Sequence, residues 1–298
     1  MRAIAVSAFG DPTVLTLVDL PTPEPGPGQV LVKVAAAGVG PWDAKGRQGA
    51  FGARQFPWVP GAEISGTVET VGTEVEGYAP GDAVYGSPSG GYAEFAAVDD
   101  AKLAPAPSAV DLVDAAAIPI GAVTALEGID DHLHLAEGDR VLVAGAAGGV
   151  GAFVVQLAKV RGAQVVATAS AANHDFLRGI GADEVVDYRN DPWSAVGTVD
   201  AAYDCVGGDT WDRCVACLRD GGRAVTIAAW GSSVRRPDVE LSVFSASVTT
   251  QRLLEIAGLV DAGRVQVEVS GRFPLAEARR AHKLIETGHT RGKLLLVP

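Results

Sequence analysis

The chain is poor in cysteine and has no surplus of positive charge. Its 298 residues include three cysteines, and 24 basic against 36 acidic residues give a formal net charge of −12. An odd number of cysteines, behind an N-terminus too short and too alternating for a signal peptide, argues against a disulfide framework. A negative chain repels phosphate backbones, so we expect no nucleic-acid partner.

Long apolar runs are also missing. No uninterrupted apolar stretch reaches the roughly 18 residues that a membrane-spanning helix needs. Nevertheless 48% of the residues are hydrophobic, which is enough for one large core or two medium ones. We therefore expect a soluble cytoplasmic protein with no membrane partner.

Two short patterns have the residue types of metal sites. Cys214 and Cys217 form a CxxC pair, but a second ligand pair is missing and the pair lies in a predicted helix, 210–218. We interpret these cysteines as small buried side chains. His132 and His134 alternate beside two aspartates. We interpret them as solvated side chains of a polar loop, and we expect no metal at either place.

Short β-rich segments separated by glycine turns fill the first hundred or so residues. Examples are 30–36, 62–71 and 92–98. The proline-rich stretch 21–28 cannot hold regular structure. Many short strands with glycine turns predict a small domain resembling a β-barrel.

Strands alternate with helices from about residue 119 onward. The first predicted strands and helices are, in turn, 140–144, 150–161, 164–168 and 173–180. A helix is also predicted before them, at 122–132. This alternation predicts a doubly wound parallel sheet. The tail repeats strand, helix and strand, at 266–269, 275–286 and 293–297.

A glycine-rich turn joins the strand 140–144 to the next helix. It reads Gly-Ala-Ala-Gly-Gly-Val-Gly, with Ala146 at the first glycine position of a dinucleotide fingerprint and Gly148 and Gly151 at the second and third. Gly148 would let the backbone approach a pyrophosphate, and Gly151 would let the helix pack on the strand. The helix N-terminus offers N–H groups to the phosphates. The expected contacts are Ala147, Gly148, Gly149, Val150 and Gly151.

The second strand of this unit ends without an acidic side chain. NAD-binding units usually place a carboxylate there, which binds the ribose 2′-hydroxyl and repels a 2′-phosphate. Here the strand ends Val-Ala-Thr-Ala-Ser at 166–170. Ser170 and Asn173 can donate hydrogen bonds to a 2′-phosphate, so we expect NADP(H) as the cofactor. A capping role for Ser170 is compatible with this contact.

These segments resemble the quinone oxidoreductase branch of the medium-chain dehydrogenase/reductase superfamily. The likeness lies in the glycine turn, in Gly-Ala-Asp at 181–183 and in three further motifs. These are Pro-Gly-Ala-Glu at 60–63, Gly-Tyr-Ala-Glu at 91–94 and Gly-Lys at 292–293. The motifs occur in family order and span essentially the whole chain.

The resemblance implies an α/β protein of two domains. Residues 1–118 and 265–298 would form a GroES-like β-barrel domain that carries the catalytic residues. Residues 119–264 would form a Rossmann domain with a doubly wound parallel sheet. The resemblance also implies a homodimer.

The family's zinc ligands are missing. Zinc-dependent members carry Cys and His where this chain resembles them at Gly40 and Ala62, and the four-cysteine loop is absent between Tyr85 and Gly90. Zinc needs several Cys, His or carboxylate ligands, so we expect no metal. Hydride transfer without a Lewis acid then points to a conjugated carbonyl substrate, because an enolate or hydroquinone spreads the developing charge.

The segment 37–47 resembles the substrate-side loop of the branch. Many members carry Asn at the position of Gly40, so one polar contact is missing here. Lys45 lies where the branch often places a residue facing the nicotinamide. Its ammonium could stabilise an enolate or deliver a proton, or it could be an exposed lysine without a role. Trp42 and Phe51 could wall an aromatic substrate slot or belong to the core.

The remaining site residues come from the resemblance alone. Thr124 would lie near the nicotinamide, and Tyr188 would contact the adenosine phosphate. Family members often have a basic residue near Ala172, which this chain lacks. Other expected cofactor contacts are the carboxamide-facing Phe244 and Ser245 and the positively charged Arg291 and Lys293. Ordinary packing or solvation is the alternative for each.

Three functions are consistent with these patterns. The first is an NADPH-dependent, zinc-independent reductase of a small quinone or α,β-unsaturated carbonyl. The second is an enoyl-thioester reductase, against which the net charge of −12 argues. The third is an NADPH-binding protein with little turnover.

Overall fold

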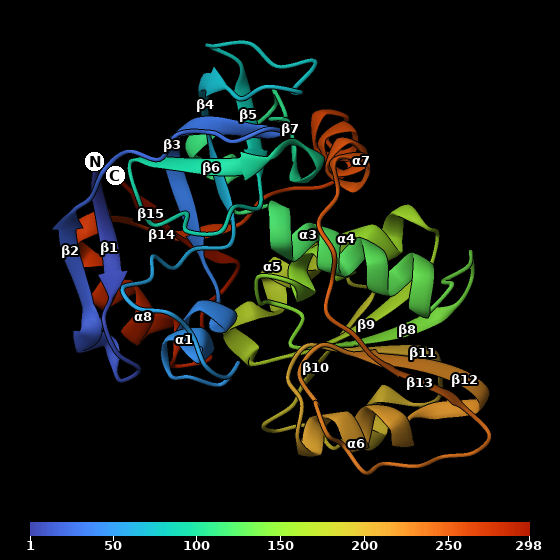
Figure 1. The fold of residues 1–298 in the computed structure, drawn as a ribbon. Helices are drawn as coiled ribbons and strands as arrows, with labels where there is room; N and C mark the ends of the chain where they lie inside the picture. The colour runs from blue at the N-terminus through green and yellow to red at the C-terminus, as the bar shows by residue number, and fades with distance from the viewer. The chain divides into compact units, whose positions relative to one another are not determined.

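The computed structural model describes residues 1–298, and the chain divides into two compact units (Figure 1). The first unit comprises Met1–Ile120, Val248–Gly263 and Val267–Pro298. The second comprises Gly121–Ser247 and Arg264–Gln266. None of the helices combines the length and the apolar character that a membrane crossing requires.

The first unit is mainly antiparallel sheet. Its strands are β1 (Arg2–Val6), β2 (Leu15–Asp19), β3 (Gln29–Val39), β4 (Ile64–Val71), β5 (Ala83–Gly86), β6 (Phe95–Asp99), β7 (Leu103–Pro105), β14 (Val269–Pro274) and β15 (Lys293–Val297). Its helices are α1 (Pro41–Arg47), α2 (Leu112–Ala115), α7 (Thr250–Asp261) and α8 (Ala278–Ile285). The main sheet has the order β14-β15-β3-β4-β5-β7, and β6 also pairs with β3.

The long strand β3 organises this sheet. It pairs antiparallel with β4, β6 and β15, and its valines are buried with those of β4 and β6 in one apolar core. A Cβ at Gly66 would lie 2.2 Å from the Lys33 carbonyl oxygen, so glycine lets β4 approach β3 closely. The C-terminal strand β15 thus completes a sheet that the N-terminal segment begins.

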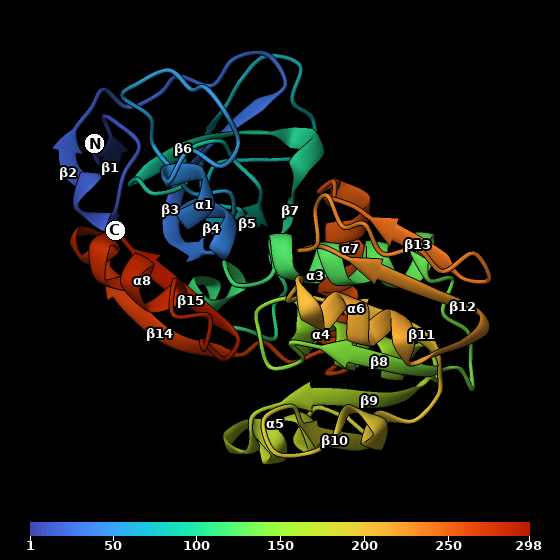
Figure 2. The ribbon, with the colours of Figure 1, turned by 90° about the horizontal axis from the view of Figure 1, so that it is seen from below.

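The second unit is a parallel sheet covered by helices. Its strands are β8 (Arg140–Ala144), β9 (Gln164–Ala169), β10 (Glu184–Asp187), β11 (Val199–Asp204), β12 (Leu218–Thr226) and β13 (Glu240–Val243). Its helices are α4 (Gly151–Val160), α5 (His174–Gly179), α6 (Asp209–Ala216) and most of α3 (Pro119–Glu127). All pairs are parallel, in the order β10-β9-β8-β11-β12-β13 (Figure 2).

The central strand β8 is apolar on both faces, as a parallel strand covered by helices must be. Its last four residues, 141–144, are fully buried. Helices α4 and α6 lie on opposite faces of the sheet (Figures 1 and 2). The predicted doubly wound parallel sheet is therefore confirmed.

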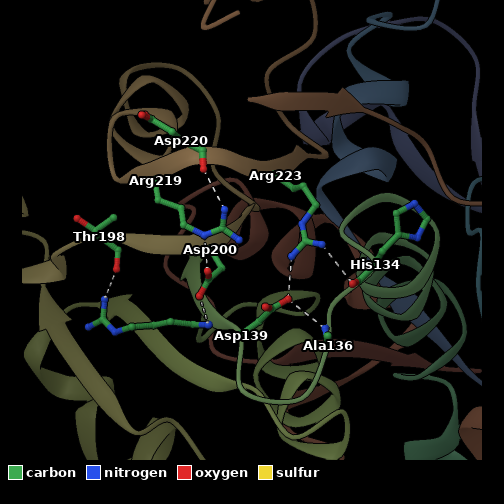
Figure 3. A network of polar contacts seen from close by, with 9 residues as sticks. His134, Ala136, Asp139, Thr198, Asp200, Arg219, Asp220 and Arg223 are labelled. Carbon is green, nitrogen blue, oxygen red and sulfur yellow. Dashed lines mark hydrogen bonds and ion pairs between the residues drawn. The ribbon is translucent and has the colours of Figure 1, made fainter. Parts of the chain in front are cut away.

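Charged groups join the amino ends of β8, β11 and β12 (Figure 3). Asp200 accepts from the Arg140 backbone N–H at 2.8 Å and from Arg219 Nε at 2.6 Å. Arg223 donates to Asp139 at 2.8 Å. These bonds lie at the edge of the sheet opposite the glycine turn, so they align the strands without occupying the edge where the turn lies.

The helix α7 belongs to the first unit. The hydroxyl of Tyr85 donates to the Leu253 carbonyl oxygen, and Thr250 Oγ1 donates to the Leu103 carbonyl oxygen at 2.8 Å. The Rossmann domain that the resemblance implies, 119–264, includes these residues. Its packing partners lie far away along the chain, and the expected domain limits stay a prediction.

Three expected elements need correction. The strand expected at 266–269 lies at Val269–Pro274, where Phe273 is buried. The helix expected at 122–132 ends at Glu127 and continues as a π-helical turn over Gly128–His132. The solvated polar loop is therefore wrong for His132, whose ring stacks on Phe244 with centroids 4.4 Å apart.

The cysteines are free thiols. Cys214 is buried on α6, as expected, whereas Cys217 is only half-buried at its C-terminal end. Burial raises the pKa of both thiols.

Candidate active site

The glycine turn connects β8 to α4 at the carboxyl edge of the parallel sheet. Gly145 has a φ of +71°, and its carbonyl oxygen accepts from Gly148 N–H at 3.1 Å. A Cβ at Gly151 would lie 2.3 Å from that same oxygen, so only glycine lets the helix begin so close to the turn. A Cβ at Gly148 would meet nothing nearer than 3.4 Å. The fold itself therefore does not require glycine at 148, but a backbone-bound ligand would.

The N-terminus of α4 has no side-chain cap. Val150 occupies the N-cap position and accepts no N–H with its side chain. The first N–H groups of a helix lack partners within the helix, and they bind anions readily. Ala147, Gly149 and Val150 lie in the same turn, so these residues fit a pyrophosphate held by backbone donors.

The helix α3 packs against the glycine turn. A Cβ at Gly121 would lie 2.3 Å from the Gly149 carbonyl oxygen, so α3 contacts the turn directly. Thr124 on the same helix is buried, and its carbonyl oxygen accepts from the Tyr203 hydroxyl at 2.8 Å. This bond anchors Thr124 to the sheet strand β11.

The carboxyl ends of β9 and β10 bring the expected adenosine contacts together. Asp187 pairs with Ala169 across the two parallel strands, so Ser170 and Tyr188 leave the sheet side by side. Ser170 makes no capping bond, which removes the alternative role considered above. Its hydroxyl accepts from Asn173 Nδ2 at 3.4 Å.

Arg189 is a cation at this edge that the sequence reasoning did not single out. Its guanidinium lies over the Tyr188 ring at 5.4 Å, and its Nε donates to the Tyr188 hydroxyl at 3.2 Å. The Arg189 side chain is exposed and forms no ion pair with a carboxylate of residues 1–298. Its place directly after Tyr188 in the sequence was the signal that could have found it.

The segment after β13 offers one buried and one exposed residue. Phe244 is buried between the rings of His132 and Tyr203, so packing fixes its position. Ser245 is exposed. Both residues lie in the second unit with the glycine turn.

In the first unit, α1 carries Trp42 and Lys45, two residues that were expected on the substrate side. Asp43 Oδ2 accepts the Gly40 N–H at 2.9 Å and so fixes the helix start. A Cβ at Gly40 would lie 2.2 Å from the Trp42 ring, so the indole fills the space that a larger residue would need. The Trp42 Nε1 donor is buried without a partner. Lys45 is exposed on the same helix.

Phe51 lies on the surface of this unit. Its side chain is 62% exposed, so the core alternative is wrong for Phe51. A Cβ at Gly46 on α1 would lie 3.6 Å from the Phe51 ring. Phe51 therefore stays beside α1, whereas Trp42 is half-buried.

A buried ion pair lies under Trp42. Lys293 Nζ donates to Glu63 Oε1 at 2.7 Å, and Glu63 also accepts the Ile120 N–H at 3.1 Å. The same ammonium lies 4.6 Å from the centre of the Trp42 ring. Burial raises the pKa of Glu63, and Lys293 opposes that rise.

The two C-terminal cations expected at the cofactor have acidic partners within the first unit. Lys293 is 3% exposed and neutralises Glu63. Arg291 Nε lies 2.6 Å from Glu268. The positive charge that both residues were expected to supply to the cofactor is thus paired with a carboxylate in each case.

Two family models match the chain. Residues 26–108 match the alcohol dehydrogenase GroES-like domain, and residues 180–296 match a model described as zinc-binding dehydrogenase. The sequence is 34% identical to the NADPH-dependent alkenal/one oxidoreductase of Arabidopsis thaliana, over all of this chain and 80% of the relative. It is 32% identical to a quinone oxidoreductase of Pseudomonas aeruginosa, over 100% and 99% of the two chains.

Solved structures agree with these relatives. The quinone oxidoreductase of Coxiella burnetii superposes with a TM-score of 0.92 at 33% identity, covering 100% of this chain and 99% of the other. A mycobacterial protein solved in complex with NADPH gives 0.90 at 33% identity, with both chains covered fully. The chain belongs to the quinone oxidoreductase branch of the medium-chain dehydrogenase/reductase superfamily. The predicted pairing of a GroES-like domain with a Rossmann domain is confirmed.

The two glycines of the turn should respond differently to alanine. Gly148→Ala should leave the melting temperature nearly unchanged but weaken NADPH binding about tenfold, a loss of about 1.4 kcal/mol. Gly151→Ala should lower the free energy of unfolding by about 1–3 kcal/mol through overpacking. Thermal unfolding and NADPH fluorescence titration measure both quantities. Equal effects of the two variants on stability would contradict this reading of the turn.

Arg189→Gln should discriminate between the two nicotinamide cofactors. Loss of a charge-assisted contact to the 2′-phosphate should raise the KM for NADPH about 10- to 100-fold, with the KM for NADH unchanged. Arg178→Gln is the matched control, since Arg178 is an exposed arginine of the same unit, 3.5 Å from Asp175. Equal changes for NADPH and NADH would remove Arg189 from the phosphate site.

Asp43 should make stability depend on pH. Burial, with the charge of Glu63 adding to it, raises the pKa of Asp43 to about 7. In an unfolded chain Asp ionises near pH 4, so between about pH 4 and 7 the folded state binds more protons and stability falls as pH rises. Across this range the raised pKa of Asp43 lowers the free energy of unfolding by a total on the order of 4 kcal/mol. Asp43→Asn should abolish this pH-dependent loss.

Thermal unfolding between pH 4 and 8 measures this slope. Asp82→Asn is the control, because it removes an exposed carboxylate that accepts the Ala79 N–H at 2.8 Å. A slope in Asp43→Asn equal to that of the unmodified protein would show that Asp43 does not titrate in this window.

Proposed function

We propose that this chain, an NADPH-dependent oxidoreductase, reduces quinones or α,β-unsaturated carbonyl compounds without a zinc ion. The NADPH-dependent alkenal/one oxidoreductase and the quinone oxidoreductases among its relatives support this substrate class. We also propose a cytoplasmic homodimer, an inference that rests on the family resemblance.

The observation that carries the proposal is the geometry at Gly40. At the position where zinc-dependent members have a ligand, this chain has no side chain, and the Trp42 indole occupies the adjacent space. Ala62 holds the second ligand position and also lacks a donor atom. In residues 1–298, no group of three or more His, Cys, Asp or Glu side chains is arranged to hold a metal. Such a site favours substrates whose product anion is delocalised without a Lewis acid.

The residues of each unit have separate tasks in this proposal. NADPH, when bound, supplies the hydride. The N–H groups at the start of α4 hold the pyrophosphate charge, and Ser170 and Arg189 hold the 2′-phosphate. Trp42 and Phe51 offer aromatic faces to a planar substrate. Lys45 Nζ holds a proton that it can give to the oxyanion of the enolate or hydroquinone anion formed by hydride addition.

Cofactor consumption by the purified protein tests the proposal. The substrates are a simple quinone, a bulky aromatic quinone, an enone and an enoyl thioester, each with NADPH and with NADH. We expect oxidation of NADPH by a quinone or the enone. Lys45→Ala should then lower kcat by about 100-fold or more, the usual contribution of a positioned general acid.

Lys33→Ala is the matched control, because Lys33 is an exposed lysine on β3 of the same unit. Turnover of the thioester alone would replace the proposal with an enoyl-thioester reductase. Tight NADPH binding with no turnover of any of the four substrates would identify a binding protein instead.

A further inference from the structure

The segment that follows β13 is held at both ends by one helical element. At its start, the Phe244 ring stacks on the His132 ring, with centroids 4.4 Å apart and an interplanar angle of 31°. At its end, the Ser247 N–H donates to Glu127 Oε2 at 3.1 Å. Glu127 ends α3, and His132 ends the π-helical turn that continues it. We call residues 244–247 the exit segment; it is a short span fixed at two points.

Tyr203 on β11 packs against the exit segment from the sheet. Its ring is fully buried and meets the Phe244 ring edge to face, with centroids 6.5 Å apart. Its hydroxyl donates to the Thr124 carbonyl oxygen on α3. A Cβ at Gly128 would lie 2.3 Å from the Tyr203 ring, so glycine lets the π-helical turn lie against this ring. Phe244 therefore contacts two aromatic rings, of which His132 is the half-buried one.

The stack of His132 on Phe244 coincides with a departure from the regular helix. The Leu133 N–H donates to the Gly128 carbonyl oxygen, five residues back, at 2.9 Å, which is the bond that defines a π turn. Such a turn holds one more residue than an α turn, so the side chains beyond it leave the helix in another direction. π turns are rare and occur frequently at functional sites.

The order of the strands decides which half of the cofactor the exit segment can meet. In the order β10-β9-β8-β11-β12-β13, the glycine turn at the end of β8 lies between two groups of strands. The proposed adenosine contacts, Ser170 and Arg189, follow β9 and β10 on one side. A dinucleotide held by its pyrophosphate at the turn must then extend its nicotinamide half over the carboxyl ends of β11, β12 and β13. The exit segment begins at the carboxyl end of β13.

The middle of the exit segment has unused hydrogen-bonding groups. The backbone N–H groups of Ser245 and Ala246 donate to no other group of residues 1–298, and the Ser245 side chain is exposed. A carboxamide such as that of nicotinamide can both donate and accept, so it can pair with a peptide N–H and a carbonyl oxygen. A backbone already fixed in place binds such a group better, because ordering a mobile segment on binding costs affinity.

We propose that His132 is a positioning residue for the cofactor, because its ring holds Phe244 and so fixes the exit segment where the nicotinamide half of NADPH binds. The bond from Ser247 to Glu127 has the same effect at the other end of the segment. His132 itself does not need to touch the cofactor. The inference rests on the proposed cofactor contacts at the glycine turn and at Arg189, and it is independent of the substrate class.

Two ligands separate this role from a merely structural one. NADPH has both halves of the cofactor, whereas adenosine 2′,5′-bisphosphate has the adenosine and the 2′-phosphate but no nicotinamide. His132→Ala should raise the Kd for NADPH about three- to tenfold, the range that corresponds to one lost aromatic pair. The Kd for adenosine 2′,5′-bisphosphate should stay unchanged. Isothermal titration calorimetry with the full chain measures both constants.

His132→Phe provides the rescue. Its ring can stack on Phe244 in the same place, so this variant should bind NADPH as the unmodified protein does. His134→Asn is the matched control, because His134 is exposed two residues further along and asparagine tolerates its positive φ of 45°. The control should keep both dissociation constants, whatever its effect on the melting temperature.

Equal weakening of both ligands in His132→Ala, or no change for either, would overturn the inference. If His132→Ala does not fold, Glu127→Ala decides. It removes the acceptor of the Ser247 N–H and should show the same selective loss, which Glu127→Gln should restore. Failure of the proposed cofactor site would look different, because the unmodified protein would then not bind adenosine 2′,5′-bisphosphate, and the inference would fall with the site.

Discussion

Burial of charge is the constraint on which the first unit depends. Glu63 and Lys293 are 230 residues apart in sequence, yet their side chains meet at 2.7 Å in the interior. Removing two charges from water is costly, and a buried pair is therefore weak support for stability. The pair instead favours one arrangement of the chain, because burying either charge without its partner would destabilise the fold far more than burying the pair. The C-terminal strand must accordingly lie beside β3, with Leu294 opposite Val39.

The same constraint shapes the part of the unit that is proposed to face the substrate. The buried pair lies under the Trp42 ring, and the buried Asp43 holds the first turn of α1. Polar groups in such a place need partners, since each unpaired one costs about 1–3 kcal/mol. Asp43 has the Gly40 N–H as such a partner, and Arg47 on the same helix donates from Nε to His282 Nδ1 at 3.3 Å. The position of α1 is thus tied to α8 by a buried hydrogen bond.

In the second unit, the proposed cofactor site depends mainly on backbone groups and not on buried charged side chains. A chain with a net charge of −12 has no general attraction for a phosphorylated ligand. In the proposed site, backbone N–H groups at the start of α4 would hold the phosphates without charged side chains, since the helix fixes their direction. Selectivity for the 2′-phosphate would then depend on a few local donors at the ends of β9 and β10, with Arg189 as the proposed cation.

Sequence patterns were sufficient for the fold class and for the glycine turn. Alternating strands and helices, and a turn that begins a helix, are local features. Short segments of the sequence are therefore enough to predict them. The packing of helix α7 could not be predicted, because its bonds to Tyr85 and Leu103 join segments that are distant in sequence. The hydrogen bond from Arg47 to His282 was invisible for the same reason. Only the packing of α8 brings these groups together.

Gly40 and Trp42 show why an absent side chain cannot be interpreted alone. From the sequence, Gly40 reads as a lost polar contact, because the family resemblance implies Asn at this position. In the fold, the Trp42 ring lies 2.2 Å from where a Cβ at Gly40 would be, so the glycine and the indole are one feature. The smaller residue admits the larger one, which lies against Lys293 and keeps its N–H donor buried and unpaired. Glycine at position 40 is therefore what the neighbouring indole requires, and this requirement cannot be recognised from Gly40 alone.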